Sequence, residues 1–343
     1  MHGMFKYYVP VFYTLLQIIT LISIGWILKR YGKWPENFFT TLSTFLIRLA
    51  LPIYLFIIVS KTDYTELGKS WMFFAAAIGM IFTGLGLSRL AAMPLASDRS
   101  DKRLISAFSG FNNAGYIPLS IVEIMPLTMP VLYAYFGTRI PSFYISLYVL
   151  CQSPLLWTLG NYLVTGRGRR PKLQEMLSPP VVGIVLGLLF LLPGMRTILL
   201  DERLPVYHVY IALSRFGNIA IPLILVCLGT MIADLKVDRG TWKGFMKLAL
   251  PVMGMRFLVM PGVFFLSYFL IFRPAGFSPA QCFVIFLESG SPPATNLSLM
   301  ASRAGINENK VAFVILVTYI FYLLVLPVYL LLFLSLPGIL GGS

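Results

Sequence analysis

The sequence predicts an all-α membrane protein with ten transmembrane helices, arranged as two inverted five-helix repeats in which helices 4 and 9 are broken and cross. Hydrophobic residues make up 58% of the 343 residues and charged residues only 12%. The apolar runs are long enough to span a bilayer as helices, and landmark residues recur between the two halves of the chain. A β-barrel would instead show short segments of alternating hydrophobicity. We therefore expect a single transmembrane domain over residues 1–343.

Hydropathy and helix-breaking residues divide the chain into ten predicted spans with short polar connections. In chain order they are residues 9–28, 38–59, 71–93, 104–136, 140–164, 179–195, 205–233, 244–272, 278–302 and 310–334. The first repeat covers 9–164 and the second covers 179–334. Because each repeat has an odd number of spans, the second must enter the membrane from the opposite side, as in many secondary transporters.

The two repeats are predicted from residues that recur at a nearly constant offset. The pairs are Pro10 with Pro180, Pro52 with Pro222, Trp71 with Trp242, Pro118 with Pro292, and Pro154 with Pro327. Around the second pair the local sequences are also alike, LALPIYL at 49–55 and IAIPLIL at 219–225. The order of the pairs indicates a duplicated unit.

Basic residues predict the orientation in the membrane. A net charge of +14 would suggest nucleic acid for a soluble protein, but a multi-pass protein concentrates Lys and Arg in its cytoplasmic loops. We therefore expect no nucleic-acid partner. The odd-numbered loops hold 17 of these residues, whereas the N-terminus and the even-numbered loops hold 7. Both termini should be extracytoplasmic, in a protein of the plasma (inner) membrane.

Two predicted spans contain residues that break helices. The fourth span contains SGFNNAGYIP at 109–118, and the ninth contains ESGSPPATN at 288–296. Proline removes backbone hydrogen bonds from a helix, and non-helical backbone at membrane depth requires surrounding protein or a watery cavity. One such break could be a packing kink. Two breaks at matched positions of inverted repeats indicate a substrate site near the bilayer midplane.

These motifs resemble the auxin efflux carrier family, and its PIN-likes branch in particular. Residues 113–119 fit the branch's N-x-G-x-[LI]-P-L pattern, and residues 292–296 resemble its P-P-A-x-N. RLALP at 48–52, Gln152 with Trp157, and RFLVMPG at 256–262 are similar to the second, fifth and eighth spans of the family. Unlike the plant PIN proteins, this chain has no long loop between spans five and six and no carboxylate between residues 78 and 87.

The resemblance implies an architecture and a mechanism. Spans 1, 2, 6 and 7 would form a scaffold domain, and spans 3–5 and 8–10 a transport domain with crossing broken helices. An organic anion would be moved by elevator-type alternating access: auxin in plants, or small carboxylates such as malate and malonate in bacteria.

We expect the anion to bind beside the broken helices, where free backbone N–H groups and the positive end of a helix dipole attract negative charge. Arg48 lies one helical turn before Pro52 and could supply positive charge, or it could snorkel to the interface; Arg215 is expected to snorkel. Arg256 is either a partner for helix ends or part of the site. The candidate substrate-binding residues are Arg48, Asn112, Asn113, Gly115, Tyr116, Pro118, Gln152, Pro292, Pro293, Thr295 and Asn296.

Coupling to an ion or a proton would use the carboxylates near the breaks. Glu123 and Glu288, with Ser289 and Ser291, could bind Na⁺, which prefers oxygen ligands. Either carboxylate could instead carry H⁺, because burial favours the protonated form. Each could also merely cap a helix or pair with a neighbouring arginine.

The main prediction is therefore a secondary transporter of a small organic anion surrounded by membrane lipids, and a homodimer is left open. A transporter-like receptor that only binds its ligand is the alternative. We expect no enzyme, because paired catalytic carboxylates, HExxH and a nucleophile beside a base are absent from the sequence. With two histidines and three cysteines in apolar stretches, we expect no metal site and no cofactor. A channel would need a ring-like filter.

Overall fold

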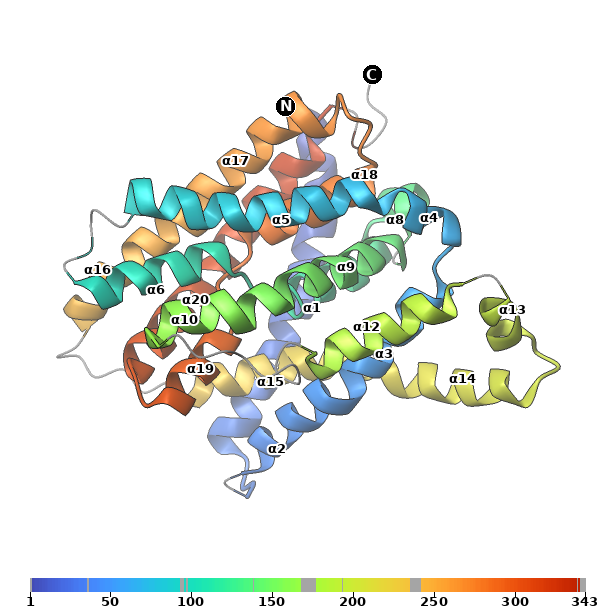
Figure 1. The fold of residues 1–343 in the computed structure, drawn as a ribbon, viewed down its shortest axis with the longest axis horizontal. Helices are drawn as coiled ribbons and strands as arrows, with labels where there is room; N and C mark the ends of the chain where they lie inside the picture. Colours follow the sequence, from blue (N-terminus) through green and yellow to red (C-terminus); the bar gives the residue numbers. More distant parts are fainter. Residues whose placement is uncertain are drawn as a thin grey trace.

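The computed structural model describes residues 2–35, 37–92, 96, 98–137, 139–167, 177–192, 194–234, 242–337 and 339. Over these residues the chain is helical and forms no β-strand, apart from one isolated antiparallel bridge between Asn112 and Pro293. Figure 1 shows long helices that cross one another in a single bundle. The predicted all-α class is confirmed.

The first half of the chain contributes α1 to α10. In chain order the elements are α1 (His2–Tyr31), α2 (Phe38–Phe45), the π-helical turn η1 (Leu46–Ala50), α3 (Leu51–Lys61), α4 (Tyr64–Gly68), α5 (Ser70–Leu87), η2 (Ser88–Ala92), α6 (Arg99–Gly110), α7 (Ile117–Thr128), α8 (Pro130–Phe136), α9 (Arg139–Leu155), η4 (Leu156–Gly160) and α10 (Asn161–Thr165).

The second half contributes α12 to α20. In chain order the elements are α12 (Pro179–Phe190), α13 (Met195–Leu200), α14 (Pro205–Gly217), α15 (Ala220–Asp234), α16 (Trp242–Gly254), η5 (Met255–Val259), α17 (Met260–Ser267), η6 (Tyr268–Phe272), α18 (Pro279–Gly290), α19 (Asn296–Ala304) and α20 (Glu308–Leu334). The end of α20 lies on the side of the bundle where α1 begins (Figure 1).

Seven helical stretches in the described part of the chain are long and apolar enough to cross a membrane. They are Tyr7–Tyr31, Phe38–Lys61, Ser70–Leu90, Arg139–Thr165, Pro205–Asp234, Trp242–Phe272 and Glu308–Leu334. These correspond to predicted spans 1, 2, 3, 5, 7, 8 and 10. The protein is therefore a multi-pass membrane protein, and the arrangement of ten spans in inverted repeats stays a prediction.

The other three predicted spans differ from the structure in their continuity or length. The fourth, 104–136, is divided into α6, α7 and α8. The division between α7 and α8 lies at Pro130, which has no N–H with which to continue α7. The sixth, 179–195, is shorter, since α12 ends at Phe190. The ninth, 278–302, is divided into α18 and α19, so both predicted helix breaks are present.

One of the recurring residue pairs is wrong as a structural equivalence. Pro118 lies in the first turn of α7, whereas Pro292 lies between α18 and α19. The helices before the two breaks end at Gly110 and Gly290. A chain can contain unrelated prolines near the same point in each half, and only the helix ends identify which residues correspond.

Glycines bring helices from opposite halves of the chain into close contact. A Cβ atom added to Gly25 of α1 would lie 1.9 Å from the carbonyl oxygen of Val226 in α15, and one on Gly229 would lie 1.9 Å from that of Ile22. Where α12 meets α3, a Cβ atom on Gly183 would approach a backbone oxygen in the same way. Small residues allow this approach between membrane helices, so spans 1 and 7, and spans 2 and 6, form tight pairs.

Several basic residues that predict the orientation lie outside the described residues. They are Arg169, Arg170, Lys172, Lys236 and Arg239. The extracytoplasmic location of both termini stays a prediction.

Candidate functional site

The two helix breaks lie against each other and pair through their backbones. The N–H of Asn113 donates to the carbonyl oxygen of Pro292 over 2.8 Å, and the N–H of Ala294 donates to that of Phe111 over 3.0 Å. Backbone groups that leave a helix inside a membrane need partners. The segment between α6 and α7 and the segment between α18 and α19 supply these partners to each other.

Arg256 in η5 holds the ends of the helices before both breaks. Its side chain is 2% exposed. Its Nε donates to the carbonyl oxygen of Ser291 over 2.7 Å, Nη1 donates to that of Ser109 over 3.1 Å, and Nη2 donates to that of Glu288 over 2.9 Å. The last carbonyls of a helix lack partners within it. Of the two roles predicted for Arg256, the structure places it at the helix ends.

Asn112 lies at the centre of a cluster of buried polar side chains beside the break between α6 and α7. Its Nδ2 donates to Oε2 of Glu288. The hydroxyl of Tyr148 donates to its Oδ1 over 3.2 Å, and Nε2 of Gln152 donates to its backbone oxygen over 2.7 Å. The amide of Gln152 therefore supports the broken segment directly.

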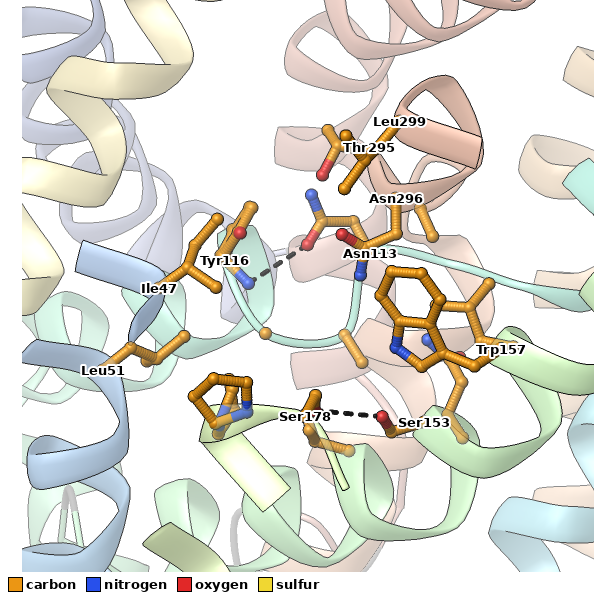
Figure 2. A pocket seen from close by; sticks show the side chains of 18 of the residues that line it. Ile47, Leu51, Asn113, Tyr116, Ser153, Trp157, Ser178, Thr295, Asn296 and Leu299 are labelled. Carbon is orange, nitrogen blue, oxygen red and sulfur yellow. Dashed lines mark hydrogen bonds between the residues drawn. The ribbon is translucent and has the colours of Figure 1, made fainter. Parts of the chain in front are cut away.

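Asn113 orients the start of α7. Its Oδ1 accepts from the backbone N–H of Tyr116 over 3.2 Å, as Figure 2 shows. Its Nδ2 donates to the hydroxyl of Tyr319 in α20. Pro118 lies in the first turn of α7, where its missing N–H costs nothing.

A cavity of about 710 Å³ lies beside the two breaks. Figure 2 shows side chains from both breaks, α2 to α3, α9 to η4 and the start of α12 around it. The lining residues are Thr44, Ile47, Arg48, Leu51, Leu55, Asn112, Asn113, Ala114, Gly115, Tyr116, Val149, Gln152, Ser153, Leu156, Trp157, Ser178, Pro179, Pro180, Ala294, Thr295, Asn296, Leu299 and Arg303.

Most of the predicted substrate-binding residues line this cavity. They are Arg48, Asn112, Asn113, Gly115, Tyr116, Gln152, Thr295 and Asn296. A Cβ atom added to Gly115 would have only Val149 near it, at 3.9 Å, so the backbone at this position is open to the cavity. Pro118, Pro292 and Pro293 are not among the lining residues. Instead they shape the broken segments.

The two charged side chains among the described lining residues are both basic. Arg48 lies in η1, Arg303 lies near the end of α19, and both are exposed. No Asp or Glu is among the described lining residues. The cavity thus combines positive charge, amides and hydroxyls with apolar surface from residues such as Trp157, which suits an organic anion.

Arg303 and several hydroxyls are lining residues that the sequence did not single out. Asn296, Leu299 and Arg303 are spaced by three and four residues, which places them on one face of a helix, so this spacing was a usable signal for Arg303. Ser153 and Ser178 lie 3.2 Å apart between their hydroxyl oxygens and contribute polar groups on the side opposite α19 (Figure 2). No local pattern marks these two serines.

The two candidate coupling carboxylates lie outside the cavity lining. The hydroxyls of Tyr54 and Ser142 donate to Oε1 of Glu123 in α7, the second over 2.6 Å. Glu288 in α18 is 1% exposed, and its Oε1 has no hydrogen-bond partner in the described part of the chain. No arginine side chain pairs with either carboxylate among the described ion pairs.

The two candidate serines bind backbone of their own helix. Ser289 Oγ donates to the carbonyl oxygen of Phe286 and Ser291 Oγ to that of Leu287, each over 2.7 Å. No group of three or more His, Cys, Asp or Glu side chains that could hold a metal ion is found in the residues that the structure covers.

Comparison with known proteins also indicates a membrane transport protein. The family model described as "Membrane transport protein" matches residues 10–170 and 168–330. An uncharacterized transporter of Methanothermobacter thermautotrophicus is 25% identical over 324 residues, which is 92% of this chain and 96% of that protein. Protein PIN-LIKES 7 of Arabidopsis thaliana is 29% identical over 171 residues, which is 48% of this chain and 41% of the plant protein. Protein PIN-LIKES 5 from the same plant is 26% identical over the same length.

Proposed function

The chain belongs to the membrane transport protein family that includes the auxin efflux carriers, and from this premise we propose that it is a secondary transporter of a small organic anion. The single observation that carries the choice of an anion is the cavity beside the paired breaks. Its two charged lining residues are Arg48 and Arg303, and its described lining contains no carboxylate. An anion entering this cavity leaves water for a site that already holds compensating charge.

In this proposal the substrate's carboxylate lies beside the start of α7. The N-terminus of that helix carries roughly half a positive charge, and Gly115 leaves room for close approach to the backbone. Arg48 and Arg303 add charge from two sides. The apolar part of the substrate packs against Tyr116, Trp157 and the aliphatic lining residues.

Elevator-type movement is the second part of the proposal. Its support is the tight glycine packing of α1 with α15 and of α3 with α12, which would make these helices a rigid scaffold. The cavity lies where these scaffold helices meet the broken helices. The hydrogen bond between Ser153 of α9 and Ser178, just before α12, joins the proposed moving part to the proposed scaffold. The broken helices would move as a unit against the scaffold and carry the anion.

Counterflow in proteoliposomes tests the proposed function. Vesicles loaded with unlabelled malonate, malate or indole-3-acetate should take up the same labelled compound from outside, and vesicles without protein should not. Malonate and malate represent short carboxylates, and indole-3-acetate represents an aromatic one. Saturable binding to the purified protein without counterflow for any of these anions would contradict transport and identify a receptor.

A further inference from the structure

The carboxyl group of Glu288 is a buried and only partly hydrogen-bonded acid beside the paired breaks. It is 1% exposed, accepts one hydrogen bond from Asn112 Nδ2, and leaves Oε1 without a partner in the described chain. An ionised carboxylate in a dry environment is costly unless it is paired and fully hydrogen-bonded. A single hydrogen bond from the Asn112 amide does not meet that requirement.

Arg256 is the nearest basic group, but its charge is already balanced by the fold. Its guanidinium donates to the backbone oxygens of Ser109, Glu288 and Ser291, at the ends of α6 and α18. The C-terminal end of a helix carries roughly half a negative charge, so two such ends compensate one arginine, which stays protonated in proteins. A negative charge on Glu288 would therefore have no uncompensated positive charge beside it to stabilise it.

We propose that Glu288 is a proton-binding site and that the proton is carried together with the anion, which makes the protein an anion–proton symporter. This inference rests on the proposed function. The residue that links the two ligands is Asn112, which is one of the residues lining the cavity and whose side chain binds Glu288. An anion beside Asn112 and an ionised Glu288 would repel each other, so protonation of Glu288 favours binding of the anion.

A sodium ion fits this position less well than a proton. Sodium needs several oxygen ligands, but the Ser291 carbonyl accepts from Arg256, and the Ser289 and Ser291 hydroxyls donate to backbone oxygens of their own helix. A proton requires only Oε1 of Glu288, which has no hydrogen-bond partner among the described residues.

The other titratable groups around Glu288 come from the elements packed against α18. Tyr148 of α9, Arg256 of η5 and Tyr322 of α20 lie within electrostatic range of it. In α7, Glu123 is bound by Tyr54 and Ser142 instead. The tyrosines of α8 are exposed, and α5 and α17 contain no titratable side chain.

Protonation can be measured without any substrate. Infrared spectra of the protein in lipid vesicles, recorded as pH is raised, should contain a protonated-carboxyl band at neutral pH. This band should be missing from Glu288→Gln and unchanged in Glu202→Gln, a matched change of an exposed carboxylate. A Glu288→Gln spectrum identical to the wild type at neutral pH would overturn the proton site, whatever the protein transports. If Glu288→Gln does not fold, Glu288→Asp should shift the titration of the band, and an unshifted titration would also overturn it.

Transport measurements then test the coupling separately. For whichever of malonate, malate and indole-3-acetate gives counterflow, an inward proton gradient should drive accumulation and a sodium gradient should not. Because one proton is linked to binding, the apparent affinity should fall by up to tenfold per pH unit above the titration of Glu288. In Glu288→Gln the ratio of gradient-driven accumulation to counterflow should fall.

Counterflow with accumulation driven by sodium, or by neither gradient, would overturn symport and leave the proposed function intact. Absence of counterflow for all three anions contradicts both.

Discussion

The backbone N–H of Asn113 donates to the carbonyl oxygen of Pro292 over 2.8 Å, which joins two helix breaks from opposite halves of the sequence. The same asparagine lines the cavity, and its side-chain oxygen accepts a hydrogen bond from the backbone N–H of Tyr116, just before α7. A residue with these three contacts connects the backbone pairing to the proposed anion site. Its substitution should therefore affect binding more than substitution of a neighbour that lacks one of them.

Replacing Asn113 by alanine should weaken anion binding by about 1–3 kcal/mol, because a buried polar partner is left unsatisfied. Asn113→Asp should be worse, since it places a negative charge against the substrate's own. Affinity for a carboxylate that gives counterflow is the measurement. Tyr319→Phe is the control, because it removes only the hydroxyl that Asn113 contacts and should have a smaller effect. An Asp variant that binds as tightly as the wild type would remove Asn113 from the site.

Arg48→Gln and Arg303→Gln should each weaken binding by about 1 kcal/mol, the upper end for an exposed ion pair. High salt should reduce the difference between wild type and variants, because exposed charges are screened. The matched control is Arg215→Gln, which changes an exposed arginine of α14 that does not line the cavity. If all three variants bind with wild-type affinity, the positive charge of the cavity is not used for binding.

Arg256→Leu should destabilise the fold by roughly 3 kcal/mol or more, because the carbonyl oxygens at two helix ends lose their donors inside the bundle. Arg256→Lys should be intermediate, since an ammonium cannot reproduce the planar set of donors. Thermal unfolding in detergent measures the change. Arg273→Gln, at an exposed position after η6, should unfold like the wild type. Equal melting temperatures for Arg256→Leu and the wild type would contradict the role at the helix ends.

Gly229→Ala should destabilise the contact between α1 and α15, because its methyl group would lie 1.9 Å from the carbonyl oxygen of Ile22. Overpacking of this kind typically costs about 1–3 kcal/mol. Gly79→Ala is the matched control, since nothing lies within 4 Å of a Cβ atom at that position. The melting temperature should fall only in the first variant, and an equal fall in both would show that the helix contact is looser than described.

The predicted orientation can be tested by cysteine labelling in intact cells. In a background without native cysteines, a cysteine replacing Arg169 should resist an impermeant reagent added outside, whereas one replacing Arg196 should react. The physical reason is that basic residues concentrate in cytoplasmic loops. Reaction at Arg169 with protection at Arg196 would reverse the orientation.

The sequence alone was enough to predict an all-helical membrane protein and the two breaks that pair in the structure. Composition and the length of apolar runs suffice for the first, because a lipid environment permits few backbone arrangements. Prolines, glycines and asparagines at 109–118 and 288–296 suffice for the second, because they act on local backbone hydrogen bonds. The resemblance to the auxin efflux carrier family is confirmed by the family match and by the PIN-LIKES relatives.

Which residues come into contact depends on the packing of the helices. Arg256 is far in sequence from its partner Ser109, and Asn112 is far in sequence from its partner Glu288. No local sequence pattern predicts either pairing. The sequence also left open whether Arg48 reaches the site, and it did not single out Arg303 or the Ser153–Ser178 contact. These contacts depend on how helices from both halves pack. Glycine spacing and the pairing of two breaks set that packing, and neither can be read from a single segment of the chain.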